Sequence, residues 1–124
     1  MTNSTQIKYR VEFYEKENGT APARDFLLSL DARQLAKMAH IIELLQNNGP
    51  ELREPYSKHL IDGIFELRAR FGTDSNRVLY FFYEGGLIIL TNGFVKKTQK
   101  TPKREIEKAK NYRKDYLSRK EQAK

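Results

Sequence analysis

The stretch RVLYFFYEGGLIILTNGFVKKTQKTP, residues 77–102, decides the fold that the sequence predicts. Two runs rich in apolar, aromatic and β-branched residues, 78–83 and 87–90, flank the short segment 84–86, which contains two glycines. A short glycine-containing connection between two such runs is typical of a β-hairpin. The stretch therefore predicts two antiparallel strands at the centre of a sheet.

Two further segments have the alternation of a strand with one buried face. In residues 64–71, IFELRARF, apolar side chains fall on one side and Glu66, Arg68 and Arg70 on the other. Residues 7–14, IKYRVEFY, alternate in the same way. A period of two residues is that of a pleated strand. We therefore expect four strands in total.

Three helices are expected between and after these strands. Pro22 suits the first turn of a short helix that runs to about Leu30. Asp31 is typical of an N-cap, and the helix that follows it stops at residues 48–50, Asn-Gly-Pro. The last helix starts near Thr101 or Pro102 and shows a polar and an apolar side. The first two helices are expected to form a hairpin.

These elements predict an α+β fold, with a small, mostly antiparallel four-stranded sheet, an N-terminal helical hairpin and a C-terminal helix. Residues 51–63 are too irregular to assign to an element. The helices are expected to cover one face of the sheet and to leave the other open. Residues 1–124 are expected to form a single domain, with flexible ends at 1–6 and about 118–124.

The composition excludes several kinds of chemistry. The chain has no cysteine, which excludes disulfides, thiolate metal sites and cysteine nucleophiles, and its two histidines argue against a histidine-rich metal centre. No metal and no other cofactor is expected. Nothing resembles a signal peptide, and no apolar run approaches the roughly 18 residues of a membrane span. We therefore expect a cytoplasmic protein.

The net charge of +7 is concentrated near the C-terminus. From Lys96 onwards there are 12 Lys and Arg against 4 Asp and Glu, whereas residues 1–95 hold 11 against 12. Such a segment attracts polyanions, either nucleic acid or an acidic protein partner. The alternative is a lysine-rich helix that is simply solvated.

Cationic side chains are expected to gather at one end of the sheet. Arg77 begins a strand across a tight turn from Arg68 and Arg70, so three guanidinium groups are expected near one another. Another cluster, Lys96, Lys97 and Lys100, follows the last strand. The alternatives are that Arg68 and Arg70 form the solvent side of a strand, with Glu66 as a partner, and that the lysines mark a flexible loop.

The runs GIFELRAR, NRVLYFF and GFVKKTQKTPKREIEKA resemble the RelE/ParE superfamily of bacterial toxins from toxin–antitoxin pairs, and most closely its HigB-type, phage-protein-related branch. The resemblance spans roughly residues 8–117. It implies a compact toxin that enters the ribosomal A site and cleaves messenger RNA during translation. It also implies a HigA-like helix-turn-helix antitoxin that holds the toxin inactive in a heterotetramer. A second implied possibility is a non-enzymatic, ParE-like toxin that binds DNA gyrase.

The resemblance also implies roles for individual residues. Arg77 matches an arginine that contacts the scissile phosphate, and Lys96 and Lys97 fall where the family has a further catalytic basic residue. Lys58 falls near lysines used for proton transfer. A tyrosine that some relatives use after the basic loop has no counterpart here, since residues 101–103 are Thr, Pro and Lys.

Elementary chemistry supports a metal-independent ribonuclease with these residues. Arginine binds phosphate oxygens in two places and keeps its charge, and crowded lysines have lowered pKa values suited to proton transfer. His59 is a candidate general acid or base, although a lone histidine is more often a surface residue. The candidate catalytic residues are Arg77, Lys96, Lys97 and Arg68. The candidate RNA-binding residues are Lys58, Arg70, Lys100 and Lys103.

Overall fold

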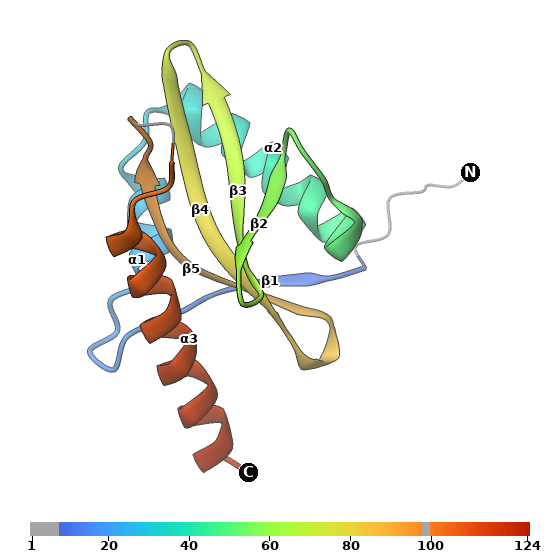
Figure 1. The fold of residues 1–124 in the computed structure, drawn as a ribbon, viewed down its shortest axis with the longest axis vertical. Coiled ribbons are helices and arrows are strands. Elements are labelled where there is room, and N and C mark those ends of the chain that lie inside the picture. The colour runs from blue at the N-terminus through green and yellow to red at the C-terminus, as the bar shows by residue number, and fades with distance from the viewer. Residues whose placement is uncertain (1–7, 98–99) are drawn as a thin grey trace.

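The computed structural model describes residues 8–97 and 100–124. Within them the chain forms five strands and three α-helices, joined by short connections that include two single-turn 3₁₀ helices, Gly49–Glu51 and Glu84–Gly86 (Figure 1). The helices and strands, in chain order, are β1 (Arg10–Phe13), α1 (Pro22–Leu28), α2 (Ala32–Asn48), β2 (Ser57–Ile61), β3 (Ile64–Phe71), β4 (Asp74–Tyr83), β5 (Leu87–Val95) and α3 (Lys103–Gln122). The expected flexible segment 1–6 lies outside the described residues.

The strands form one mixed sheet in the order β1-β5-β4-β3-β2. β1 runs parallel to β5, with Arg10 opposite Leu87, and the other three strand pairs are antiparallel. The prediction of a four-stranded sheet with an N-terminal helical hairpin is therefore wrong. The sheet has five strands, and the N-terminal element is a strand, which is followed by the two helices.

The unpredicted strand is β2, at the edge of the sheet. It pairs with β3, placing Lys58 opposite Glu66, but the register shifts between His59 and Ile61. Ser57 is buried, whereas the rest of the strand is exposed or half-buried. Charged residues and bulges are typical of edge strands, because they discourage pairing with other chains. The same features removed the alternation by which the other strands were recognised.

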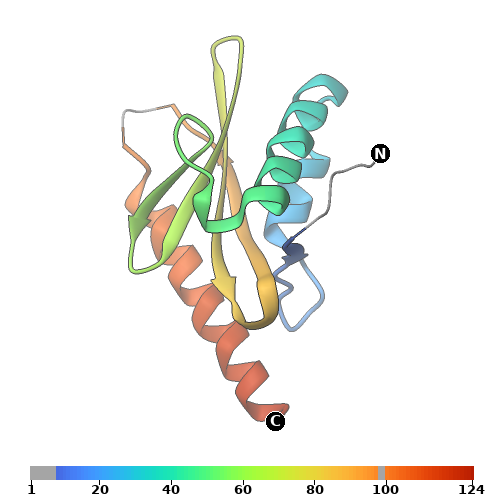
Figure 2. The ribbon, with the colours of Figure 1, turned by 90° about the vertical axis from the view of Figure 1, so that its right-hand side faces the viewer.

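Both faces of the sheet are covered by helices. α1 and α2 lie on one face and α3 lies on the other (Figure 2). On the first face, Leu67 and Tyr80 of the sheet join Met38 and Leu45 of α2 in the largest core cluster. The second face has a smaller cluster formed by Ile64, Leu79 and Ala109. The prediction that one face stays open is thus wrong, because α3 packs across the face that carries Glu66 and Arg68.

α1 packs closely against β5 at a glycine. A Cβ atom on Gly93 would lie only 2.3 Å from Cδ2 of Phe26, so only the absence of a side chain at residue 93 allows the ring to lie there.

The N-cap of α2 is as predicted, since Asp31 Oδ1 accepts a hydrogen bond of 2.9 Å from the main-chain nitrogen of Gln34. In the described part of the chain, no helix has both the length and the apolar character to cross a membrane.

α3 reaches β1 through side chains near its C-terminal end. The hydroxyl of Tyr14 donates to Asp115 Oδ2 at 2.6 Å, and the hydroxyl of Tyr116 donates to Glu12 Oε1 at 2.9 Å. The ring of Tyr14 also stacks on Tyr112. These contacts fix the direction of α3 across the sheet, and the last turns of the helix extend beyond the strands (Figures 1 and 2).

Candidate functional site

Two arginines face each other across neighbouring strands. The register of β3 and β4 places Arg68 directly opposite Arg77, on the face of the sheet that α3 covers. Like charges in directly opposite positions of an antiparallel pair repel each other and destabilise the sheet. The arrangement therefore requires an anion close to both guanidinium groups. We call Arg68 and Arg77 the guanidinium pair.

Glu66 is that anion. Its side chain is completely buried, and Oε1 accepts a hydrogen bond of 3.1 Å from Arg68 Nε and one of 2.9 Å from Arg77 NH1. Oε2 accepts a hydrogen bond from the hydroxyl of Thr101, just before α3. A buried carboxylate is tolerated where it is paired and hydrogen-bonded in this way. One carboxylate thus joins two strands and the segment that leads into α3.

The guanidinium pair keeps donors that Glu66 does not use. Arg77 Nε donates to Ser75 Oγ at 3.0 Å, so Arg77 binds protein through Nε and NH1. Arg68 NH1 lies 3.5 Å from an oxygen of Glu54, whose side chain is 65% exposed. Among the described residues, NH2 of neither arginine takes part in a hydrogen bond. Burial lowers the pKa of Arg77, an effect that Glu66 opposes, but a guanidinium group remains cationic.

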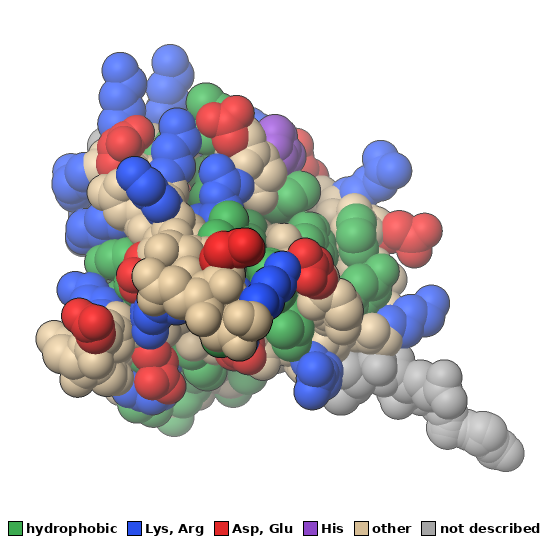
Figure 3. Space-filling model, turned by 90° about the horizontal axis from the view of Figure 1, so that it is seen from below, with side chains coloured by type: hydrophobic (Ala, Val, Ile, Leu, Met, Phe, Trp, Pro, Cys, Tyr) green, Lys and Arg blue, Asp and Glu red, His purple; other side chains and the backbone are tan. Residues whose placement is uncertain are grey.

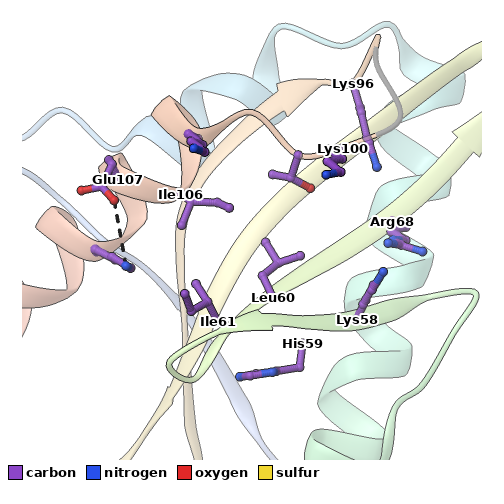
Figure 4. Close-up of a pocket in the computed structure, with 12 residues that line it drawn as sticks. Lys58, His59, Leu60, Ile61, Arg68, Lys96, Lys100, Ile106 and Glu107 are labelled. Carbon is purple, nitrogen blue, oxygen red and sulfur yellow. Dashed lines mark ion pairs between the residues drawn. The ribbon is translucent and has the colours of Figure 1, made fainter.

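A cleft of about 580 Å³ opens beside the guanidinium pair, between the β2–β3 hairpin and the start of α3. We call it the cationic cleft. Its wall includes Arg68, and Lys58 and Lys96 point toward this arginine from opposite sides (Figure 4). Its lining residues are Lys58, His59, Leu60, Ile61, Arg68, Lys96, Lys100, Thr101, Lys103, Ile106, Glu107 and Lys110.

The cleft has an apolar part as well as a charged part. Leu60 and Ile61 from β2 face Ile106 from α3 (Figure 4). Beyond them, Lys110 is held by Glu107 at 3.9 Å and by Asp62 at 3.7 Å. The cations near Arg68 are therefore separated from this ion-pair group by an apolar surface.

Viewed from the end at which α3 finishes, Lys and Arg side chains stand out along one margin of the molecule, while acidic and basic side chains are mixed elsewhere (Figure 3).

The surroundings of Lys96 lower the pKa of its ammonium group. Burial lowers the pKa of Lys96, the positive charges of Arg77, Arg68 and Lys58 lower it further, and Glu66 opposes them. Its main-chain nitrogen donates to the carbonyl oxygen of Ser75 at 2.8 Å, so Ser75 contacts both Lys96 and Arg77. Among the described residues, no carboxylate forms an ion pair with Lys96 or with Lys58.

The structure brings most of the sequence-predicted site residues together, but not all of them. Six of the predicted residues line the cationic cleft: Lys58, His59, Arg68, Lys96, Lys100 and Lys103. Arg70 and Arg77 line a second hollow of about 380 Å³, which shares Arg68 with the cleft. Lys97 is exposed and lines neither cavity. The predicted residues therefore surround the guanidinium pair on two sides, with Lys97 outside.

His59 lies at the edge of the cleft and belongs structurally to the β2–β3 turn. Its Nε2 accepts a hydrogen bond of 3.1 Å from the main-chain nitrogen of Gly63, and its ring packs edge-on against Phe65. The ring extends to the opposite side of β2 from Lys58 (Figure 4). These contacts orient the imidazole away from the guanidinium pair.

Sequence reasoning placed Glu66 only as an alternative partner of Arg68 and missed its bond to Arg77. The available signal was the alternation of β3, which puts Glu66 and Arg68 on one face. The missing information was the register that brings Arg77 opposite Arg68.

Within residues 8–97 and 100–124, no three His, Asp or Glu side chains gather in a way that could hold a metal ion.

A family model described as phage-derived protein, Gp49-like, matches residues 25–114, which extend from α1 into α3 and include every element of the cationic cleft. No curated protein matches the chain.

Proposed function

Because the chain belongs to the phage-derived Gp49-like family, a family of RelE-like, toxin-type proteins, we propose that it is the HigB-type toxin of a toxin–antitoxin pair and cleaves messenger RNA on the ribosome. The observation that supports this proposal is the guanidinium pair beside a cleft whose rim carries Lys58 and Lys96. Six of the twelve residues that line the cleft are Lys or Arg.

The proposed reaction uses the 2′-hydroxyl of the RNA as the nucleophile. Its oxygen attacks the adjacent phosphorus while a base removes its proton, and the 5′-oxygen leaves with a proton from an acid. The products are a 2′,3′-cyclic phosphate and a 5′-hydroxyl end. A negative charge develops on the phosphorane oxygens, and preorganised cationic donors are most effective at such a place.

Each step has a suitable group in the structure. The unused NH2 groups of Arg68 and Arg77 bind phosphate oxygens, since planar guanidinium groups form paired hydrogen bonds with phosphate. Lys96, with its lowered pKa, acts as the base, and Lys58 on the other side of the cleft acts as the acid. Arg70, Lys100 and Lys103 hold the flanking backbone.

The apolar part of the cleft suits a nucleobase next to the scissile phosphate. Leu60, Ile61 and Ile106 offer apolar contact but no hydrogen-bonding side chain. Phosphate contacts contribute affinity without reading sequence. We therefore expect a weak intrinsic sequence preference.

The proposed partner that controls the toxin is a HigA-like helix-turn-helix antitoxin, which neutralises it within a heterotetramer.

Replacing Lys96 by alanine tests the proposal, with Lys97→Ala as a matched control. A positioned acid or base contributes roughly 10²–10⁴-fold to a rate. We expect Lys96→Ala to reduce messenger RNA cleavage by about that factor, and Lys97→Ala to change it little because Lys97 lies outside the cleft. The readout is the mapping of RNA 5′ ends after induction, with antitoxin binding measured in parallel to show that each variant folds.

The same experiment separates the nuclease from the gyrase-binding alternative. Messages cut within codons support the proposal. Intact messages together with breaks in the chromosome contradict it and favour a ParE-like toxin. Equal loss of cleavage in both lysine variants would refute the assignment of the base to Lys96.

A further inference from the structure

On the basis of the function proposed above, we propose that Glu66 is a positioning residue, which holds Arg68 and Arg77 in the orientation that receives the phosphate. Glu66 does not itself touch RNA in this role, because its side chain is completely buried beneath the guanidinium pair and Thr101.

The first reason is that one oxygen organises both arginines. Oε1 of Glu66 accepts from Arg68 at 3.1 Å and from Arg77 at 2.9 Å, so the two guanidinium groups converge on a single point. Without this acceptor, two directly opposed cations would move apart. The convergence leaves an NH2 group of each arginine outside the hydrogen bonds of the described residues. In the proposed role, these two groups bind the two non-bridging oxygens of one phosphate.

The second reason is the local charge. Two guanidinium groups against one buried carboxylate leave a net charge of +1 before the lysines are counted. Glu54 also approaches Arg68, but it is mostly exposed and lies 3.5 Å away. An exposed ion pair of this kind contributes little and is readily exchanged for another anion. Glu66 therefore holds the guanidinium pair in place and leaves it with a net positive charge. A second buried carboxylate would cancel that charge and with it the attraction of the guanidinium pair for phosphate.

The third reason is that Glu66 also connects the arginines to the segment that precedes α3. Oε2 accepts from the hydroxyl of Thr101, which lines the cationic cleft. On the other side, Ser75 binds Arg77 through its hydroxyl and Lys96 through its carbonyl oxygen. The phosphate-binding groups and the proposed base are thus held in a common frame, in which Glu66 is the only carboxylate among the described residues that contacts both arginines.

The test compares Glu66→Gln and Glu66→Asp with a matched control, Glu105→Gln. Glu105 is also a buried carboxylate, 6% exposed, but it binds Asn92 and Lys108 rather than the guanidinium pair. Each variant is assayed for single-turnover cleavage of messenger RNA on programmed ribosomes over a range of toxin concentrations and pH. Thermal unfolding and antitoxin binding report whether each variant folds.

We expect Glu66→Gln to lower the saturating cleavage rate by about 100-fold or more, in the range of a misplaced catalytic group. The half-saturating concentration should change less than about threefold, because removal of a negative charge does not weaken attraction for RNA. The pH profile should also move to lower pH, since Glu66 opposes the lowering of the pKa of Lys96. The charged groups that face Lys96 are Arg77 from β4, Glu66 and Arg68 from β3, and Lys58 from β2, and Lys100 and Lys103 line the same cleft.

Glu66→Asp retains the charge but withdraws the carboxylate by one methylene group. It should slow cleavage without moving the pH profile, and it tests the proposal even if Glu66→Gln fails to fold. Glu105→Gln should leave both the rate and the profile unchanged. Wild-type rates in both Glu66 variants, or an equal loss in Glu105→Gln, would overturn the positioning role. A wild-type protein that cuts no message would instead refute the proposed function and this role with it.

Discussion

A single buried hydroxyl pair ties the edge strand to the core. Tyr80 of β4 is 1% exposed and its ring stacks on Phe65. Its hydroxyl is hydrogen-bonded to Ser57, at the start of β2 and also buried. Burial raises the pKa of Tyr80 to about 12, an effect that the bond to Ser57 partly offsets. The neutral phenol is therefore the form that the folded state favours.

Tyr80→Phe should lower the free energy of unfolding by about 1–3 kcal/mol, because it leaves the hydroxyl of Ser57 buried without its partner. Ser57→Ala should have a similar cost, and the double variant should cost less than the sum. Urea unfolding at neutral pH measures all three values. Strict additivity would show that the two hydroxyl groups do not stabilise each other.

The same residue predicts a loss of stability at alkaline pH. Since the pKa of Tyr80 is higher in the folded state than the value of 10.0 expected when unfolded, its contribution is complete below pH 10 and is lost as the pH rises toward 12. The difference in unfolding free energy between wild type and Tyr80→Phe should therefore shrink from pH 9 to pH 11. A constant difference would contradict this assignment. The pKa of Tyr14 is also raised to about 12. Because Tyr14 is present in both proteins, its titration does not contribute to the difference between them.

The candidate site illustrates what residue-level reasoning can and cannot provide. The gathering of guanidinium groups at one end of the sheet was predictable, because Arg77 begins a strand across a tight turn from Arg68 and Arg70. The pairing of Arg68 with Arg77 through Glu66 was not, since it depends on which residues of β3 and β4 lie opposite each other. Lys97 could not be separated from Lys96 by sequence either, because the difference lies in the direction that the chain takes after β5.

At the scale of elements, α1 is joined to β5 by the contact between Phe26 and Gly93. Gly93→Ala should lower the free energy of unfolding by about 1–3 kcal/mol, because the new methyl group would overlap the ring. The cost should largely disappear in a Phe26→Ala background, which provides the missing space. Chemical denaturation of the four proteins measures both effects. A similar cost in both backgrounds would place the strain in the backbone of β5 instead.

Strong periodicity predicted some elements well. The alternation of IFELRARF predicted a strand at residues 64–71, and β3 has these bounds. Asp31 predicted the start of α2 because its side chain can cap only a helix that begins at the next residue. β2 escaped prediction since an edge strand with a register shift needs no alternation. The face that α3 covers was also not predictable, because an apolar stripe shows that a helix packs but not against what.

At the scale of the whole molecule, the net charge of +7 is unevenly distributed over the surface. The cationic cleft concentrates lysines and an arginine on one side, whereas acidic and basic groups are mixed near the end of α3 (Figure 3). A protein that neutralises phosphates releases counterions, so its affinity for RNA falls as salt rises. This dependence reports how many cations lie against the backbone.

Lys58→Gln should reduce the slope of log affinity against log salt by about 0.7 for single-stranded RNA, the value expected for one phosphate contact. Lys114→Gln is the matched control, because Lys114 is exposed on α3 and lies outside the cleft. Fluorescence anisotropy with a short RNA, measured over a range of salt concentrations, gives both slopes. Equal slopes for the two variants would place the RNA elsewhere on the surface.

The pairing of β1 with β5 has a consequence for synthesis. Arg10 meets Leu87, so the first described strand has no neighbour in the sheet until the last strand has left the ribosome. Lys96 and Thr101 emerge later still. A nascent chain therefore completes its sheet and its cationic cleft almost together, and translation products that stop before β5 have neither one complete. The proposed cleavage activity therefore requires an almost complete chain.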